Sequence, residues 1–164
     1  MIFNINSIPE KIRGEINTIE SFMKFFKVEK YEINDDGVEI NQNVRFFAIL
    51  DSFPFKIKTM NGDLNLSNCL LTKLNNLPLV VDGNLNLNSN KLLNLDYCPT
   101  VFGNLSCDNN KQLTSISGLR DVIGNFSSIG CNIQNIDCFE CKIIKGSMNL
   151  SYNSISVIKN GVSL

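Results

Sequence analysis

The sequence predicts an α/β-type repeat protein dominated by β structure, a solenoid of about six coils with one parallel sheet and an N-terminal cap. Three observations predict this fold class. Glycines recur at intervals of 21, 20, 21 and 22 residues from Gly62 to Gly146, paired apolar positions follow each of them, and a helical stripe with a hairpin pattern precedes them. Self-similarity at a period of roughly 20 to 50 residues is typical of stacked repeats.

Residues 1–42 are expected to form a cap over the first coil. Residues 15–28 place five apolar side chains on one helical stripe, which are Ile16, Ile19, Phe22, Met23 and Phe26. Residues 31–33 and 38–40 then alternate apolar and polar side chains around Asn34, Asp35, Asp36 and Gly37. This pattern predicts a β-hairpin with Asp-Gly as its turn.

Residues 43–164 are expected to form the solenoid, in units that start near 43, 62, 83, 103, 124 and 146, so that cap and coils make a single compact domain. The last five units carry apolar or small residues at two positions one residue apart, which are Leu64 and Leu66, Leu85 and Leu87, Leu105 and Cys107, Phe126 and Ser128, and Met148 and Leu150. Three residues later stands Cys69, Asn90, Asn110, Cys131 or Asn153. This is the L-x-L-x-x-N/C signature of a leucine-rich repeat. Val44 and Phe46 mark a weaker first unit.

The repeat has a physical interpretation. Alternate residues of a short strand face the same way, so stacked units form a parallel sheet over a continuous apolar interior. The Asn amide is expected to bond backbone groups of its own and the neighbouring coil, with Cys as a compact substitute. Each glycine is expected to supply a tight or positive-φ turn, and segments such as 77–80 and 98–101 are expected to close the units as turns.

The C-terminal unit is not followed by a second cap helix in the sequence. Val162 and Leu164 are expected to form a last short edge strand, or else a partner or a second copy covers the terminal coil.

On these motifs the chain resembles the short leucine-rich-repeat proteins of tailed bacteriophages, and more loosely the bacterial class with repeats of about 20 residues. The resemblance rests on the helix followed by YEINDDG at 31–37 and on units such as GDLNLSNCLLTKLNNLP at 62–78. It implies a non-enzymatic interaction protein. Segments such as GNFSSIGCNIQNI depart from the family pattern, so the resemblance implies the fold rather than a shared ligand.

Composition narrows the choice of partner. The chain has 164 residues, 43% of them hydrophobic and 19% charged, which is enough for one core. A net charge of −1 gives no general attraction to nucleic acid or anionic lipid. Without a signal-like start or a run of about 18 apolar residues, we expect a cytoplasmic protein with reduced cysteines and no membrane contact.

Candidate contact residues are those beside the inward positions, on the outer face of the predicted sheet. They are Arg45, Phe47, Asn65, Ser67, Asn86, Asn88, Ser106, Asp108, Ser127, Ile129, Asn149 and Ser151. The structural alternative is that Asn and Ser simply solubilise an exposed face. Phe47, Ile129 and Arg45 are the strongest contact candidates, unless Phe47 packs under the cap.

Catalytic and metal-binding chemistry has little support. The chain has no histidine, which is the commonest general base and metal ligand. Cys138 and Cys141 form a CxxC pair that would supply half of a zinc site or a redox pair, but the alignment of Phe139 with Leu77 favours ordinary turn residues. We therefore expect no catalytic residues, no metal and no cofactor.

The sequence thus predicts a non-enzymatic protein-binding scaffold, in the setting of the resemblance a phage protein that engages a host or defence protein in the host-cell cytoplasm. No nucleic acid is expected as a partner. The alternative is a structural component that self-assembles, as a homo-oligomer, through its uncapped C-terminal edge.

Overall fold

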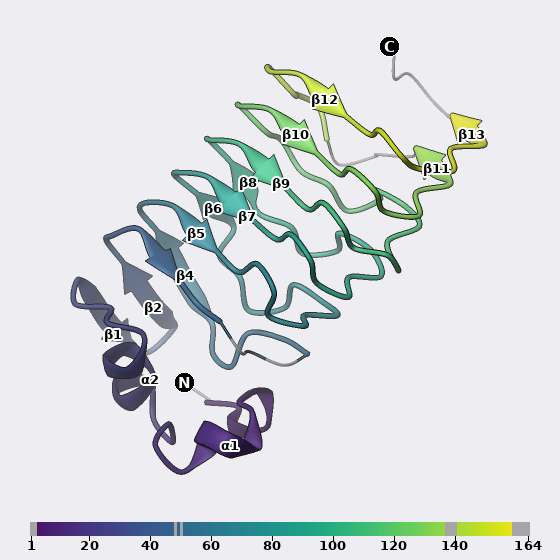
Figure 1. Cartoon of the computed structure of the whole chain (residues 1–164). Helices are drawn as coiled ribbons and strands as arrows, with labels where there is room; N and C mark the ends of the chain where they lie inside the picture. The colour runs from purple at the N-terminus through teal and green to yellow at the C-terminus, as the bar shows by residue number, and fades with distance from the viewer. Residues whose placement is uncertain (1–2, 48, 50, 137–140, 159–164) are drawn as a thin grey trace.

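The computed structural model describes residues 3–47, 49, 51–136 and 141–158. It is a β-solenoid, whose coils stack in one direction from the N-terminal helices to the last unit (Figure 1). The repeat solenoid predicted from the sequence is confirmed. Val162, Leu164, Cys138 and Phe139 lie outside the described residues, so the expectations about them stay predictions. No helix in the described ranges has the length and apolarity required to cross a membrane.

Six strands, one from each unit, form a parallel sheet in the order β12-β10-β9-β7-β5-β3. Their bounds are Val44–Arg45 for β3, Leu64–Asn65 for β5, Leu85–Asn86 for β7, Leu105–Ser106 for β9, Phe126–Ser127 for β10 and Met148–Asn149 for β12. The first apolar position of each unit pairs with that of the next, as Leu85 does with Leu105. These strands bound five complete turns of the solenoid.

A second sheet extends the predicted hairpin into segments where the sequence predicted turns. Its order is β1-β2-β4-β6-β8, with β4 at Ile57–Met60, β6 at Val80–Val81 and β8 at Thr100–Val101. Isolated bridges continue it, because Val101 pairs with Val122 and Val122 pairs with Ile144. The expectation of plain turns at 77–80 and 98–101 is therefore wrong at the ends of these segments, where β-branched residues favour an extended chain.

The predicted hairpin is confirmed and is part of this second sheet. β1, Tyr31–Asn34, pairs antiparallel with β2, Gly37–Ile40. Asn34 pairs with Gly37, so the two turn residues are Asp35 and Asp36 rather than the expected Asp-Gly. β2 then pairs in parallel with β4, and an ion pair joins the two strands, with Lys58 Nζ of β4 2.9 Å from Glu39 Oε1 of β2. The hairpin is thus continuous with the solenoid wall. A third ladder joins β11, Asn135–Ile136, with β13, Val157–Ile158.

The cap helix is shorter than predicted, since α2 spans Ile19–Phe25. Thr18 and Ser21 form a capping box at its start, which satisfies the first free N–H groups and excludes residues 15–17 from the helix. Two short elements, the 3-10 helix η1 at Ile5–Ser7 and α1 at Glu10–Arg13, precede it and were not predicted.

Aromatic rings bind the cap to the first coil. The Phe22 ring centroid lies 5.2 Å from that of Phe46 and 5.1 Å from that of Phe55, and Phe53 and Phe55 are 4.9 Å apart. Phe22 and Met23 have no exposed surface, as expected for the predicted stripe. The prediction that this helix covers the first coil is confirmed.

Buried amides connect the coils at the Asn position of the repeat, as predicted. Asn90 donates through Nδ2 to the carbonyls of Leu66 and Leu87, one in the preceding coil and one in its own, both at 2.9 Å. Its Oδ1 accepts from the N–H groups of Cys69 and Leu71. Cys131 fills the same position by donating its thiol to the Cys107 carbonyl at 3.3 Å. Backbone groups inside the solenoid thereby keep partners.

The glycines have a different role from the predicted one. Only Gly62 of this row adopts a positive φ, and the later four do not. A Cβ atom at Gly103 would lie 2.7 Å from the carbonyl carbon and oxygen of Gly83 in the preceding coil. The neighbouring Asn84 Oδ1 accepts from Asn104 N at 2.8 Å, which repeats along the stack. Close backbone stacking, not turn geometry, therefore requires glycine here.

Candidate functional site

The twelve candidate contact residues lie along the outer side of the six-stranded sheet and beyond its strand ends. Arg45, Phe47, Asn149 and Ser151 are exposed. The others are half-buried, except Ser67, whose exposed fraction is 8%. Ser67 lies in register between the larger Phe47 and Asn88, which leave a small side chain little exposed surface. Ser67 therefore offers little surface to a partner, and its role as a contact residue stays a prediction.

The polar side chains of this face already bond to one another and to the backbone. Asn88 Oδ1 accepts from Ser106 Oγ at 2.6 Å and from Asp108 N at 2.7 Å. Asp108 Oδ1 likewise accepts from Ser127 Oγ at 2.6 Å and from Ile129 N at 2.7 Å. These bonds run from coil to coil. They support the structural alternative for this face, because the strongest acceptors are already occupied.

Further asparagines hold the turn at the end of each strand. Asn65, Asn86 and Asn149 each accept, through Oδ1, from the N–H group two residues later at 3.0 Å. Such side-chain to backbone bonds are the ordinary mechanism by which Asn favours turns. Their abundance on this face is thus explained by local backbone geometry.

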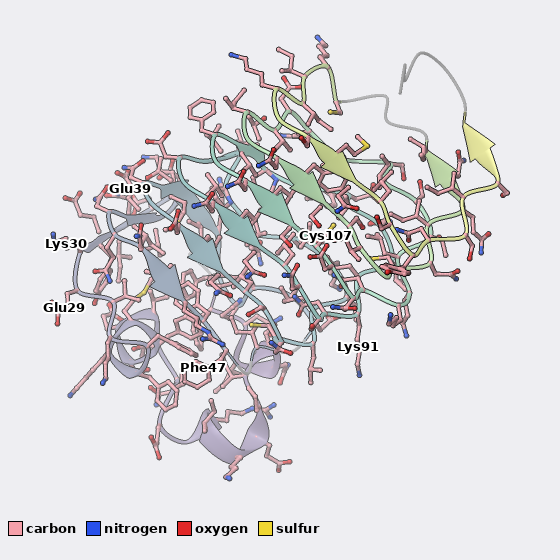
Figure 2. The ribbon with its side chains drawn as sticks, turned by 45° about the horizontal axis from the view of Figure 1, so that its top comes forward. Glu29, Lys30, Glu39, Phe47, Lys91 and Cys107 are labelled. Atoms are coloured by element: carbon pink, nitrogen blue, oxygen red, sulfur yellow. The ribbon has the colours of Figure 1, made fainter. Side chains whose placement is uncertain are left out.

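Phe47 belongs largely to the cap. Its ring centroid lies 4.8 Å from that of Phe26 and 6.1 Å from that of Phe25, and 48% of the residue remains exposed. Figure 2 places it beside the N-terminal helices. The ring thus packs against the cap, as the alternative predicted, while nearly half of the residue stays exposed.

An apolar surface that the sequence interpretation missed lies on the outer side of the second sheet. We call it the lateral patch, and it comprises Leu79, Val80, Phe102, Ile123 and Ile143. Leu79 is 71% exposed and Phe102 is 51% exposed, while Val80 and Ile143 are also exposed. The pairs Val81–Val101, Val101–Val122 and Val122–Ile144 place these residues on four successive coils, with Ile123 half-buried. Asp82, Thr100 and Asp121 lie among them in the same rows. A run of exposed apolar residues on adjacent coils is characteristic of an interaction surface.

The sequence held a signal for this patch. In Val80-Val81-Asp82 and Thr100-Val101-Phe102 the central valine is buried, and period-two alternation directs both neighbours outward. The residue before the repeat glycine is polar in three units, namely Asn61, Asp82 and Lys145. In the other two units it is apolar, namely Phe102 and Ile123. Interpreting these segments as turns concealed the alternation.

Tyr97 marks a second exposed site, since 67% of the residue is exposed. Its backbone φ is 64°, in the region that Asn76 and Gly118 also adopt at the equivalent positions. Open grooves lie on both sides of the ring, with Leu93 and Asp96 among the residues of one and Arg120 on the other. A tyrosine in this left-handed conformation costs about 1 kcal/mol or more, which the glycine and asparagine positions avoid.

Titratable groups with shifted pKa values are scattered rather than gathered at one place. Thr72 donates to the Asp51 carboxylate at 2.5 Å, and this bond with Lys73 lowers the pKa of Asp51. The hydrogen bond to Glu39 and the charge of Asp36 raise the pKa of Lys58. Among the described residues no group of three His, Cys, Asp or Glu side chains is placed to hold a metal ion. Cys141 lies within the described ranges, but its CxxC partner Cys138 does not.

Buried thiols are a further feature of the core. Burial raises the pKa of Cys98 to about 12 and that of Cys69 to about 11, and also raises the pKa of Cys107. The physical cause is the lost hydration of the thiolate. Because nucleophilic attack requires the thiolate, these side chains are expected to be unreactive in the folded protein.

Two measurements check this expectation. Iodoacetamide followed by mass spectrometry should leave Cys69, Cys98 and Cys107 unmodified in native protein and label them in urea. The raised pKa of Cys98 also makes the free energy of unfolding depend on pH. This free energy should be unaffected below the unperturbed thiol pKa of 9.0 and should fall as pH rises from there towards about 12, because in this range the thiol loses its proton in the unfolded chain but keeps it in the folded one. Rapid native labelling of Cys98 would contradict the assigned burial.

The lateral patch and the polar sheet face are thus two distinct kinds of surface. The first offers exposed apolar side chains, with Asp121 beside them accepting from Lys142 N and Ile143 N. The second offers hydrogen-bonding groups that are largely engaged. Comparison with protein-family models, curated proteins and solved structures finds no match for this chain.

Proposed function

We propose that this chain is a solenoid of the leucine-rich-repeat type that binds another protein and catalyses no reaction. The observation that carries the proposal is the lateral patch, an exposed apolar surface on consecutive coils of a rigid scaffold. Burial of apolar area contributes roughly 25 cal/mol per Å² to association. The amide positions at Asn90, Asn110 and Asn153 support the repeat type.

Charge favours a protein over a polyanion. The patch has acidic Asp82 and Asp121 beside it, and the net charge of the chain is −1. Exposed Lys142 and Lys145 lie on either side of Ile143, so acidic and basic side chains are mixed around the patch. A phosphate-rich partner is favoured by clustered cations of one sign, which is not the arrangement around this patch. From the resemblance alone, we further propose a bacteriophage protein that engages a host or defence protein in the host cytoplasm.

Phe102→Glu is expected to weaken partner binding at least about tenfold, because a carboxylate buried at an interface loses its hydration. The measurement is affinity capture from host lysate with quantitative mass spectrometry, followed by titration of the captured protein. Leu93→Glu is the matched control, since Leu93 is also an exposed apolar residue but lies outside the patch.

The control should retain the partner, and circular dichroism should show both variants folded. A partner lost equally from both variants, or retained by Phe102→Glu, would argue against the lateral patch as the binding surface.

Self-assembly through the C-terminal edge is the second candidate. Met148 and Leu150 of the last unit are half-buried, whereas the equivalent residues of an earlier coil, Leu105 and Cys107, are buried. Partly exposed core residues beside an edge strand favour strand addition. Light scattering tests this candidate, and a monomer throughout the micromolar range would reject it.

A further inference from the structure

β1 is an open edge of the second sheet. Among the described residues, β2 is its sole strand partner. The Lys30 carbonyl accepts from Asn41 N at 2.8 Å, so the backbone of Lys30 faces β2. Since successive residues of an antiparallel strand face alternately towards and away from the partner, the N–H and C=O groups of Tyr31 and Ile33 face outward. They are available to another strand.

The charges on this strand are arranged in a complementary order. Lys30 directly precedes β1, and continuing the strand's alternation by one residue places it on the same side as Glu32, opposite to Tyr31 and Ile33. Glu32 lies opposite Glu39, a like charge whose own partner is Lys58. In the described part of the chain, neither Lys30 nor Glu32 forms an ion pair. Figure 2 shows Lys30 at the margin of the molecule, away from the coils.

We propose that β1 pairs antiparallel with β1 of a second copy about a two-fold axis at Tyr31. The two Tyr31 residues then exchange both backbone hydrogen bonds, as the outward direction of these groups allows. Lys30 of each copy lies opposite Glu32 of the other. The two second sheets join into one continuous sheet across the axis.

A second copy fits this edge because one strand supplies both halves of each contact. Lys30 of each copy faces Glu32 of the other copy at a non-hydrogen-bonded position, where side chains lie close together, so two such ion pairs form. Each lysine offsets the repulsion between Glu32 and Glu39 within one copy. On the other side, Ile33, which is 40% exposed, becomes a diagonal neighbour of Tyr31 of the second copy. The charged side of the joined strands is thus complementary. This edge shares no residue with the lateral patch, so the two proposals fail independently.

Sedimentation velocity on the full chain across the micromolar range tests the dimer. Lys30→Glu alone and Glu32→Lys alone each place two pairs of like charges at the axis, and each is expected to raise the dimer dissociation constant on the order of tenfold or more. An equimolar mixture of these two variants should dimerise again, because one chain carries both acidic and the other both basic members of the pairs. The double variant, with both substitutions in one chain, should also dimerise.

Lys91→Glu is the matched control, since Lys91 is an exposed lysine on a coil distant from β1 (Figure 2), and it should dimerise as the unmodified chain does. Hydrogen exchange supplies a second measurement, in which the Tyr31 and Ile33 amides should become more protected as protein concentration rises. A monomer at every concentration would overturn the proposal. A dimer that tolerates both single substitutions, or that fails to re-form in the mixture, would also overturn it. So would a dimer that is lost in Met148→Asp, because that residue lies in the last coil and not at β1.

Discussion

Gly103→Ala is expected to destabilise the protein by about 3 kcal/mol, although it adds one methyl group. The new Cβ would lie 2.7 Å from the backbone carbonyl of Gly83 and 2.7 Å from Asn84 Oδ1. A backbone group held in a coil stack has little room to move, so the coils must separate locally and lengthen the bond from Gly103 N to Gly83 O, now 3.0 Å. Urea denaturation followed by circular dichroism measures the change.

Gly14→Ala is the matched control for this substitution. Gly14 has a φ of −66°, and no atom lies within 4 Å of a Cβ placed there. Its replacement is expected to be neutral or slightly stabilising, because alanine restricts the unfolded chain without native strain. Equal costs at the two positions would show that coil stacking does not require glycine.

Asn110→Ala is expected to cost about 4 kcal/mol of stability, since it leaves several buried backbone groups without partners. Asn110 has no exposed surface. Its Nδ2 donates to the carbonyls of Cys107 and Leu87, and its Oδ1 accepts from Leu92 N at 3.1 Å. Thermal and urea denaturation give the loss, with the urea m-value as a check that unfolding stays cooperative.

Two comparisons isolate the buried amide. Asn110→Cys should cost less than Asn110→Ala, because the chain itself places Cys131 at this position, where the thiol donates to a carbonyl of the preceding coil. Gln112→Ala removes an exposed amide nearby and should change stability by about 0.5 kcal/mol or less. If Asn110→Ala were no costlier than Gln112→Ala, water or a backbone shift would be replacing the amide.

These predictions share one physical basis. In a solenoid each coil contacts only the coils before and after it. A substitution at one repeat position therefore weakens these two interfaces, and no distant part of the core compensates for the loss. Glycine sets how closely the coils approach, and the buried amide satisfies the polar groups that this approach removes from water. A surface substitution such as Phe102→Glu is therefore expected to change binding while stability stays nearly unchanged.

Several elements were predictable because they depend on neighbouring residues in one repeat. The strand positions of the main sheet followed from the apolar pairs, and all six strands lie where the units were placed. The role of Asn90 was also predictable, because a buried amide at a fixed position must meet backbone groups of adjacent coils. The cap helix and hairpin followed from their periodicities, with errors at their ends where capping by Thr18 and turn geometry decided.

The tertiary structure alone decided the features that depend on how one coil lies on the next. The repeat spacing predicts where glycine occurs, but only the stacked backbones reveal that a Cβ would meet the preceding coil at Gly103. The Oδ1 atoms of Asn88 and Asp108 accept from N–H groups of the following coil, which gives part of the candidate contact face a structural role. Beyond the hairpin, the second sheet and its lateral patch arise from pairing between residues about 20 positions apart. Local propensity carries no information on that pairing, because two-residue strands form only when a neighbouring coil supplies their partners.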